Sequence, residues 1–177
     1  NIAALTATQI AALGTSGLSN VDVTGGTTIQ VDVANGAAFG TAGITFTDTT
    51  ANLVDTQTNI AALTATQIAA LGTSGIDAVD VTGATTVNLT VAQANALDAA
   101  NITITDTTSN IVDTQTNIAA LTATQIASLA TAGIDAVDVT GATIVDLTVA
   151  QANALDAASV TITDATSNIV DTQTNIA

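Results

Sequence analysis

The sequence predicts an α/β fold: a right-handed solenoid of stacked strand–helix coils with a parallel sheet and two coils per repeat. The first observation is a repeat, because the segment NIAALTATQIA begins at Asn1, Asn59 and Asn117, every 58 residues. A fixed period of this size is typical of solenoids and other repeat arrays. The second is that strand-like segments alternate with segments of helical spacing, which favours parallel strands joined by right-handed crossovers.

The apolar composition is the third observation. The apolar residues are Ala, Ile, Leu and Val, apart from Phe39 and Phe46. Small aliphatic side chains suit thin, regular layers better than one large globular core. We therefore interpret residues 1–177 as one solenoid array of repeats 1–58, 59–116 and 117–174, with 175–177 opening a fourth. We expect the chain to be a portion of a longer repeat tract.

The second repeat illustrates the expected order of elements. Ile76–Thr82 (IDAVDVT) alternates between apolar and polar residues and predicts a strand that ends at Gly83. Thr86–Thr90 (TVNLT) then extends the chain again briefly. Thr90 and Gln93 form a capping-box pattern, T-x-x-Q, which predicts a short helix over the following apolar and alanine residues.

The second coil of the repeat begins with another strand, predicted at Ile102–Asp106 (ITITD). The residues Asp106–Ser109 favour a helix start, so we expect helical structure from there to Leu121. Thr122 and Gln125 form a further capping box, which predicts a second helical segment. The alternative is an all-β solenoid, in which TVNLT lies on a second sheet and the threonine-rich segments are extended.

The first repeat diverges in its middle, where TIQVDVANGAAFGTAG replaces TVNLTVAQANALDAA. Residues 29–33 alternate as in a strand, Asn35-Gly36 is a turn signal, and Asp32 replaces the capping threonine. We expect a longer strand or a loop there, either as a diverged unit or as a local contact site.

The charge balance excludes several functions. The chain has no Lys, Arg, His or Cys, and its fifteen acidic residues, all Asp, give a net charge of −15. Phosphate binding needs cations, so nucleic acid and anionic membrane surfaces are not expected partners. No apolar run is long enough for membrane insertion. Without His, Cys or Lys, and with no cation to stabilise a developing negative charge, we expect no enzyme activity.

Stacking would turn each repeated residue into a row on the outer face of the sheet. We expect a row in which aspartate and threonine alternate, beside a continuous threonine ladder. The alternating row is Asp22, Thr45, Asp80, Thr103, Asp138 and Thr161. The surface ladder is Thr24, Thr47, Thr82, Thr105, Thr140 and Thr163. These threonines are good strand formers with a soluble face, and the alternative is an ice-binding surface, because the array resembles the active face of β-solenoid antifreeze proteins.

Two aspartate columns are candidate metal ligands for calcium. They are Asp48, Asp106 and Asp164, and Asp55, Asp113 and Asp171. Calcium needs about six to eight converging oxygens, and the chain has neither an EF-hand loop nor a Gly-Gly-x-Gly-x-Asp nonapeptide. Helix N-capping accounts for the first column without a metal, and no other cofactor is expected.

The segments DTTSNIVDTQTNIAALTATQIA (106–127) and VDVTGATTVNLTVAQANALDAA (79–100) resemble repeats of very large secreted or surface proteins of Gram-negative bacteria. These are adhesin-like arrays, often associated with RTX-type proteins exported by type I secretion. The resemblance covers the whole chain and implies an extracellular or cell-surface structural role. The calcium-binding nonapeptides of the RTX class are absent from this sequence.

The functional hypothesis is therefore a structural repeat, a stiff acidic spacer, fibre or layer element. Its expected partners are the neighbouring repeats of the same chain, and its open ends favour head-to-tail self-association into filaments. The alternative is a binding module that uses the Thr/Asp face for calcium, a glycan, ice or a partner surface. From a strand spacing of about 4.8 Å, two coils would give a rise of roughly 10 Å per repeat.

Overall fold

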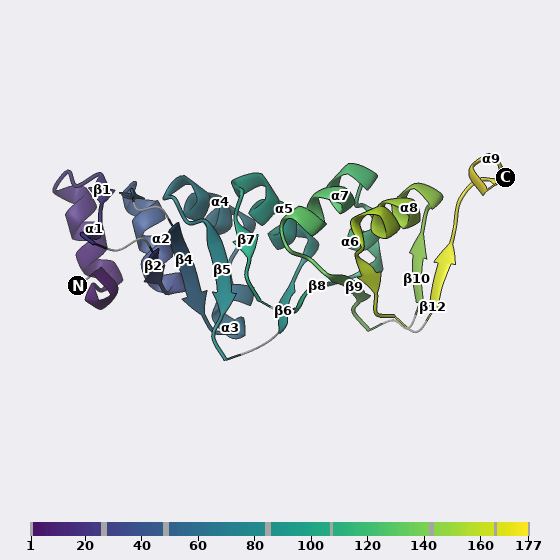
Figure 1. Ribbon diagram of the computed structural model, residues 1–177, viewed down its shortest axis with the longest axis horizontal. Coiled ribbons are helices and arrows are strands. Elements are labelled where there is room, and N and C mark those ends of the chain that lie inside the picture. Colours follow the sequence, from purple (N-terminus) through teal and green to yellow (C-terminus); the bar gives the residue numbers. More distant parts are fainter. Residues whose placement is uncertain are drawn as a thin grey trace.

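A computed structural model describes residues 2–25, 28–47, 50–83, 86–106, 108–141, 144–164 and 166–176. The fold is mixed α/β, with parallel sheets and alternating strand and helix units, and the described strands form no closed barrel. The molecule is elongated, with α1 (Ala7–Thr15) at one end and α9 (Gln173–Ile176) at the other (Figure 1).

The elements recur in the same order along the chain. The remaining helices are a short 3₁₀ helix η1 (Ile2–Ala4), α2 (Val33–Ala42), α3 (Gln57–Ala61), α4 (Ala65–Thr73), α5 (Val91–Ala100), α6 (Gln115–Ala119), α7 (Ala123–Thr131) and α8 (Val149–Ala158). The strands are β1 (Asn20–Val21), β2 (Thr28–Val31), β3 (Thr45–Phe46), β4 (Thr50–Asp55), β5 (Ala78–Val81), β6 (Thr86–Leu89), β7 (Thr103–Ile104), β8 (Thr108–Asp113), β9 (Ala136–Val139), β10 (Ile144–Leu147), β11 (Thr161–Ile162) and β12 (Thr166–Ile169).

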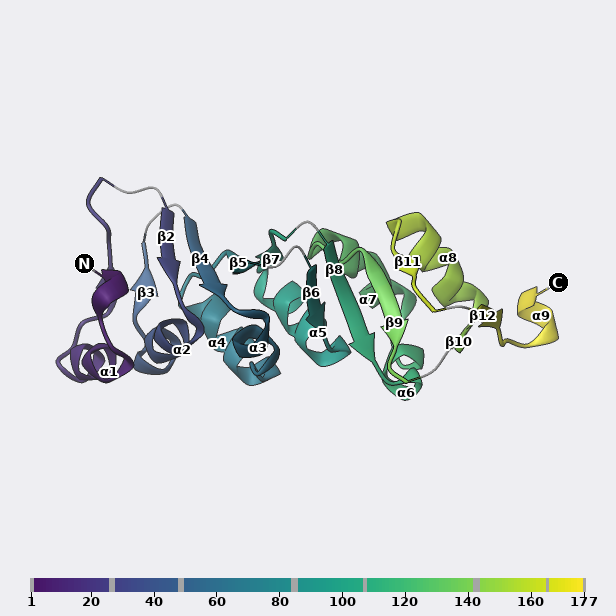
Figure 2. The same cartoon turned by 90° about the horizontal axis from the view of Figure 1, so that it is seen from below.

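The described strands form four parallel sheets. Two are four-stranded, in the orders β2-β4-β5-β7 and β6-β8-β9-β11, and the other two pair β1 with β3 and β10 with β12. Residues 58 apart share the same register, because Asn52 lies opposite Ala78 and Asn110 lies opposite Ala136. The two larger groups of strands are separate in the perpendicular view (Figure 2). The sheet is therefore interrupted at regular intervals along the molecule.

Helices α1, α2, α4, α5, α7 and α8 follow one another along the long axis (Figure 1). Neighbours in this series pack against each other. Their apolar residues join those of the strands in one core of Ile, Leu, Val, Ala and the two Phe side chains. Capping boxes start α5 at Thr90 and Gln93 and α7 at Thr122 and Gln125, as the sequence predicts.

The helix expected after Asp106 is wrong in its first half, because residues 108–113 form strand β8. This segment alternates in burial, with Ser109, Ile111 and Asp113 buried and the residues between them partly exposed. Such a period of two belongs to a strand. The helix begins only at Gln115, where the hydroxyl of Thr114 caps it.

The first repeat also differs from its prediction, because the expected longer strand or loop contains helix α2. Asp32 replaces the usual threonine as the N-cap, and its carboxylate accepts a hydrogen bond from the Asn35 backbone NH at 2.7 Å. Asn35-Gly36 is consequently part of a helix and not of a turn. An acidic N-cap is as effective as a threonine, so the divergent sequence keeps the same helix start.

Candidate functional site

The threonine ladder is the first surface to locate. Thr24, Thr47, Thr82, Thr105, Thr140 and Thr163 are all exposed, but the strand register does not align them in one row. Val79 lies opposite Ile104, which brings Thr105 beside Asp80 and not beside Thr82. The row of alternating aspartate and threonine is likewise wrong, because Thr103 lies opposite Ala78 and Thr161 lies opposite Ala136. The predicted alignment is two residues out of register, because the alternation within each strand does not determine the register between adjacent strands.

The threonines of the second coil use their hydroxyl groups within the sheet. Thr105 donates its hydroxyl to the Val79 carbonyl at 3.1 Å, and Thr47 and Thr163 donate to the equivalent carbonyls of Val21 and Val137. A hydroxyl that donates to a neighbouring strand has lost its only donor proton for a ligand. These contacts favour a structural role for this face.

The first aspartate column fixes strands and does not cap helices. The Oδ2 atom of Asp106 accepts a hydrogen bond from the Val81 NH at 2.9 Å, and Asp164 makes the same bond with Val139. Asp48 lies outside the described residues. The expected N-capping role is therefore wrong for Asp106 and Asp164, because the residues that follow them form β8 and β12. Each carboxylate instead accepts the NH at the end of a strand in the preceding coil.

Asp106 sits close to a second negative charge. Partial burial raises the pKa of its carboxyl group above the ordinary value, and the charge of Asp80 raises it further, against the hydrogen bond from Val81. Asp106 and Asp80 are therefore neighbouring carboxylates. Two carboxylates supply too few oxygens for calcium, which takes about six to eight.

The second aspartate column connects coils at helix starts. Asp113 Oδ2 accepts from the Val91 NH, the first residue of α5, at 2.9 Å. Its Oδ1 atom accepts from the Thr114 NH and from the Asn117 side chain, each at 2.7 Å. Asp55 and Asp171 make the same three contacts in their repeats. Each carboxylate therefore holds a helix N-terminus of the preceding coil, where a negative charge is favourable.

These bonds shift the titration of the column. Partial burial would raise the pKa of Asp113, but the hydrogen bonds from Asn117, Val91 and Thr114 outweigh it and lower the pKa below its ordinary value. The pKa of Asp55 is lowered against the same effect of burial. For Asp171, the bond from Asn175 is the largest cause of a lowered pKa. The lowered pKa values favour the ionised form of all three carboxylates, and their oxygens accept hydrogen bonds from the chain itself.

No group of three or more carboxylates that could hold a metal ion occurs in the described part of the chain. The structure brings Asp106 near Asp80 but gathers neither predicted column into one site. Each member instead serves its own pair of coils.

Two glutamine contacts form further links between coils. Gln57 makes a two-way contact with the Asn88 backbone: its Nε2 donates to the carbonyl at 2.8 Å and its Oε1 accepts from the NH at 3.1 Å. Gln115 makes the same contact with Asp146. The side-chain amide thus takes the place of a strand beside β6 and β10, where the sheet is interrupted. Sequence analysis missed this role, although the segment DTQTN recurs at every such position.

Gln93 has a role beyond its capping box. Its Nε2 atom donates to the carbonyl of Ala61 at the end of α3, at 3.0 Å, and to that of Leu63 in the turn before α4, at 2.8 Å. Gln151 repeats the contact with Ala119 and Leu121. The capping pattern identified these residues, but it did not predict the second bond, which depends on how the coils stack.

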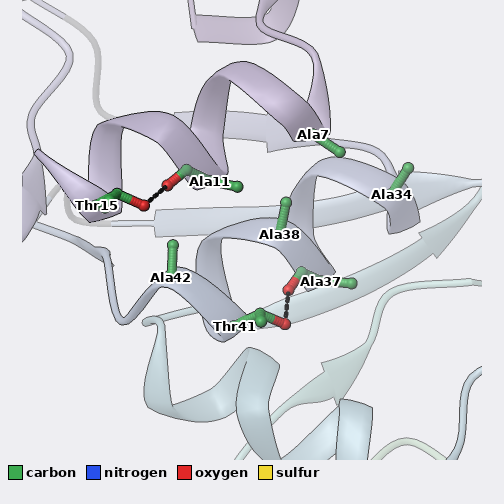
Figure 3. Close-up of a pocket in the computed structure, with 9 residues that line it drawn as sticks. Ala7, Ala11, Thr15, Ala34, Ala37, Ala38, Thr41 and Ala42 are labelled. Carbon is green, nitrogen blue, oxygen red and sulfur yellow. Dashed lines mark hydrogen bonds between the residues drawn. The ribbon is translucent and has the colours of Figure 1, made fainter.

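A shallow groove of about 570 Å³ lies between α1 and α2 (Figure 3). Alanines line it, together with Gly14, Thr15 and Thr41. The hydroxyls of Thr15 and Thr41 donate to the carbonyls of Ala11 and Ala37 in their own helices. The groove offers no charged or catalytic group, and a smaller groove between α4 and α5 is built in the same way. Both are hollows between adjacent helices with short side chains.

Neither the helices nor the comparisons with known proteins point to a further site. None of the described helices combines the length and the apolar character needed to cross a bilayer. No protein-family model matches the sequence, and no curated protein matches it either.

Proposed function

We propose that the chain forms one right-handed solenoid array, two strand–helix coils per 58-residue repeat, and serves as a stiff acidic spacer. In the parent protein the array separates or displays other parts as a stalk, fibre or layer element. The proposal places it outside the cell or on its surface, as the resemblance to adhesin-like bacterial arrays implies.

The observation that carries the proposal is the recurrence of the coil-to-coil bonds. The Asp55 carboxylate holds the first residue of α2, and Asp113 and Asp171 hold the equivalent residues of α5 and α8. Each bond joins residues 22 positions apart, so it fixes one coil against its neighbour. A structure held by the same contacts between successive units lengthens with each added unit.

The helices set the length of that step. Strand spacing alone gives a rise of roughly 10 Å per repeat, but two helices per repeat also follow one another along the axis (Figure 1). Packed helix axes lie about 8–10 Å apart, so a repeat advances by about 16–20 Å. The sheet accommodates the larger step by breaking, and Gln57 and Gln115 bridge those breaks.

The charge and the surface chemistry support a spacer. A net charge of −15 with no cation favours solubility and disfavours compact aggregation. The hydroxyls of Thr47, Thr105 and Thr163 and the carboxylate of Asp113 are bonded to the chain itself. A spacer needs this internal bonding, whereas a binding module needs such groups free to reach a ligand.

Small-angle X-ray scattering on chains of three, six and nine repeats tests the proposal. We expect the longest dimension to grow linearly, by about 16–20 Å per repeat, with a constant cross-section. Growth as a fractional power of chain length, as in a compact globule, would contradict the spacer function.

A further inference from the structure

We propose that two short segments are releasable straps, each of which detaches from the next coil while the sheets and the longer helices stay formed. The straps are residues 56–63, which contain α3, and residues 114–121, which contain α6. Opening a strap gives the array one bending point per repeat. This inference goes beyond the spacer function, because the rise per repeat does not depend on whether the straps open.

Each strap lies where the sheet is interrupted. Among the described strands, β6 is the end strand of its sheet and pairs with β8, and β10 pairs in the same way with β12. Helix α3 packs against β6, and α6 packs against β10. A short helix therefore covers the strand edge that another strand would occupy in a continuous sheet.

Two glutamine side chains hold the first strap, one at either end. At its start, Gln57 exchanges two hydrogen bonds with the Asn88 backbone. At its end, Gln93 donates to the carbonyls of Ala61 and Leu63. Both contacts are made with the coil that contains β6 and α5. A side-chain hydrogen bond adds only modest stability in competition with water, so these contacts open more readily than a strand ladder does.

Little apolar surface holds the strap down. Ile60 and Leu63 are 2% and 4% exposed, whereas the other strap residues after Gln57 are exposed. The second strap repeats this pattern, with Ile118 and Leu121 buried. A segment with few buried apolar contacts opens locally at a lower free energy than the whole structure unfolds.

Opening a strap leaves the other contacts of the junction in place. Residues 52–55 of β4 pair with Ala78–Val81 of β5, and α4 packs against α5. Neither contact involves a strap residue. The two coils therefore stay joined through β4, β5 and the helix layer, which act as a hinge, while the edge of β6 is released.

Hydrogen exchange followed by nuclear magnetic resonance tests the opening of the strap. The Asn88 NH donates to Gln57, and the Ile60 NH donates to the N-cap carbonyl of α3. One opening event exposes both amides, so we expect both to exchange faster than Ile111 in β8, which is paired on two sides. Gln57→Ala should speed exchange of the Ile60 NH at least about tenfold, although it leaves the hydrogen bond of that NH intact.

Gln115→Ala is the matched control, because it releases the second strap. It should speed exchange of the Ile118 NH and leave Ile60 unchanged, whereas Gln57→Ala should do the reverse. Thermal melting verifies that both variants keep the fold. Strap amides that exchange as slowly as Ile111, or an Ile60 exchange rate that Gln57→Ala leaves unchanged, would overturn the inference.

Pulsed electron paramagnetic resonance tests the bending point. Spin labels at Thr66 and Thr124, exposed residues of α4 and α7, bracket the break that Gln57 bridges, whereas the break at Gln115 lies beyond them. Gln57→Ala should therefore broaden the distribution of this distance, and Gln115→Ala should not. The mean distance tests the stacked array and the width tests the strap, so the two proposals can fail separately. Equal widths in the unmodified chain and in both variants would overturn the bending point.

Discussion

The middle of the first repeat and the middle of the second build the same helix with different cores. Helices α2 and α5 have ten residues each and follow an N-cap at equivalent positions. Gly36, Phe39 and Phe46 in the first repeat replace Ala94, Leu97 and Ile104 in the second. The rings of Phe39 and Phe46 meet edge to face, with centroids 4.8 Å apart.

The replacement of Ala94 and Leu97 by Gly36 and Phe39 keeps the core around the helix filled. A Cβ atom added at Gly36 would lie 2.8 Å from Leu53 Cδ1 and 2.9 Å from Leu71 Cδ2, so the space that an alanine methyl group occupies in α5 is already taken. The larger ring at position 39 accompanies the missing methyl group at position 36. The coil geometry is therefore retained by compensating changes and not by conserving each residue, as close packing requires.

The largest expected effect breaks this compensation. Phe39→Leu should lower the free energy of unfolding by about 1–3 kcal/mol because it leaves a cavity. Gly36→Ala should cost about 1–3 kcal/mol because it overpacks the two leucines. The double variant restores the α5 residues at two of the three exchanged positions, so its loss should fall short of the sum by about 1 kcal/mol or more. Urea unfolding of the four proteins measures the coupling, and strict additivity would contradict the account.

The second prediction compares two helix–helix contacts. A Cβ atom at Gly40 would lie 2.9 Å from the Ala70 carbonyl oxygen, which is backbone and cannot move away. Gly40→Ala should therefore cost about 2 kcal/mol. A Cβ atom at Gly72 would lie 2.7 Å from Ala100 Cβ and 3.1 Å from the Ala100 carbonyl oxygen. Residues with a Cβ atom occupy both equivalent positions elsewhere in the chain, Asp98 and Ala130, so the two variants should behave alike. Gly72→Ala should also cost about 2 kcal/mol, and an unchanged thermal melting temperature for either variant would contradict the close helix contact.

The third prediction separates a capping bond from a bond between coils. Gln67 and Gln93 both complete capping boxes, but Gln93 also reaches the carbonyls of Ala61 and Leu63. Gln93→Ala should cost about 2–3 kcal/mol, since it leaves buried carbonyls unsatisfied. Gln67→Ala should cost about 1 kcal/mol. If urea unfolding gave both variants the same loss, the second bond of Gln93 would contribute nothing.

The smallest expected effect is a dependence on pH. The lowered pKa of Asp113 means that its contribution is fully present above the unfolded pKa of about 4 and disappears as the pH falls through the folded pKa. Asp113→Asn should lower the free energy of unfolding by about 1–2 kcal/mol at pH 7, because an amide cannot accept all three bonds. The difference from the unmodified chain should shrink below about pH 4.

Asp156→Asn is the control for charge, because Asp156 is exposed and the substitution removes the same charge. Its melting temperature should follow that of the unmodified chain at every pH. A constant difference between Asp113→Asn and the unmodified chain from neutral to acidic pH would show that ionisation of Asp113 does not stabilise the coil contact.

The strand–helix alternation could be predicted from the sequence because it rests on local signals. Each T-x-x-Q capping box, and the alternating segment at Ala78–Val81, spans only a few residues of the sequence. These local patterns predict the helices and the strand correctly. Strand β8 was missed because Thr, Ser and Asn in TSNIVD also favour a helix start. The segment forms a strand because it pairs with β6 on one side and β9 on the other. These pairings join residues far apart in the sequence, so local patterns do not predict them.

The predicted alignment of the aspartate and threonine rows was wrong for a related reason. Composition and spacing identified Asp106, Asp113 and Thr105 as repeated residues, but their partners depend on the register between coils. A shift of two residues keeps the same side chains outward, so the pattern could not distinguish the two alignments. The hydrogen bonds of Gln57 and Gln93 join residues about thirty positions apart in the sequence. They could be identified only from the structure, in which these segments lie side by side.

The most direct test of the stacked array is a set of distances between equivalent positions. Thr8, Thr66 and Thr124 are exposed residues at the same place in α1, α4 and α7, and the chain contains no cysteine. Pairs of these residues can therefore be changed to cysteine, spin-labelled and measured by pulsed electron paramagnetic resonance. The account predicts equal distances of about 16–20 Å for the pairs 8–66 and 66–124, and about twice that for 8–124. Unequal steps, or an 8–124 distance no longer than a single step, would contradict it.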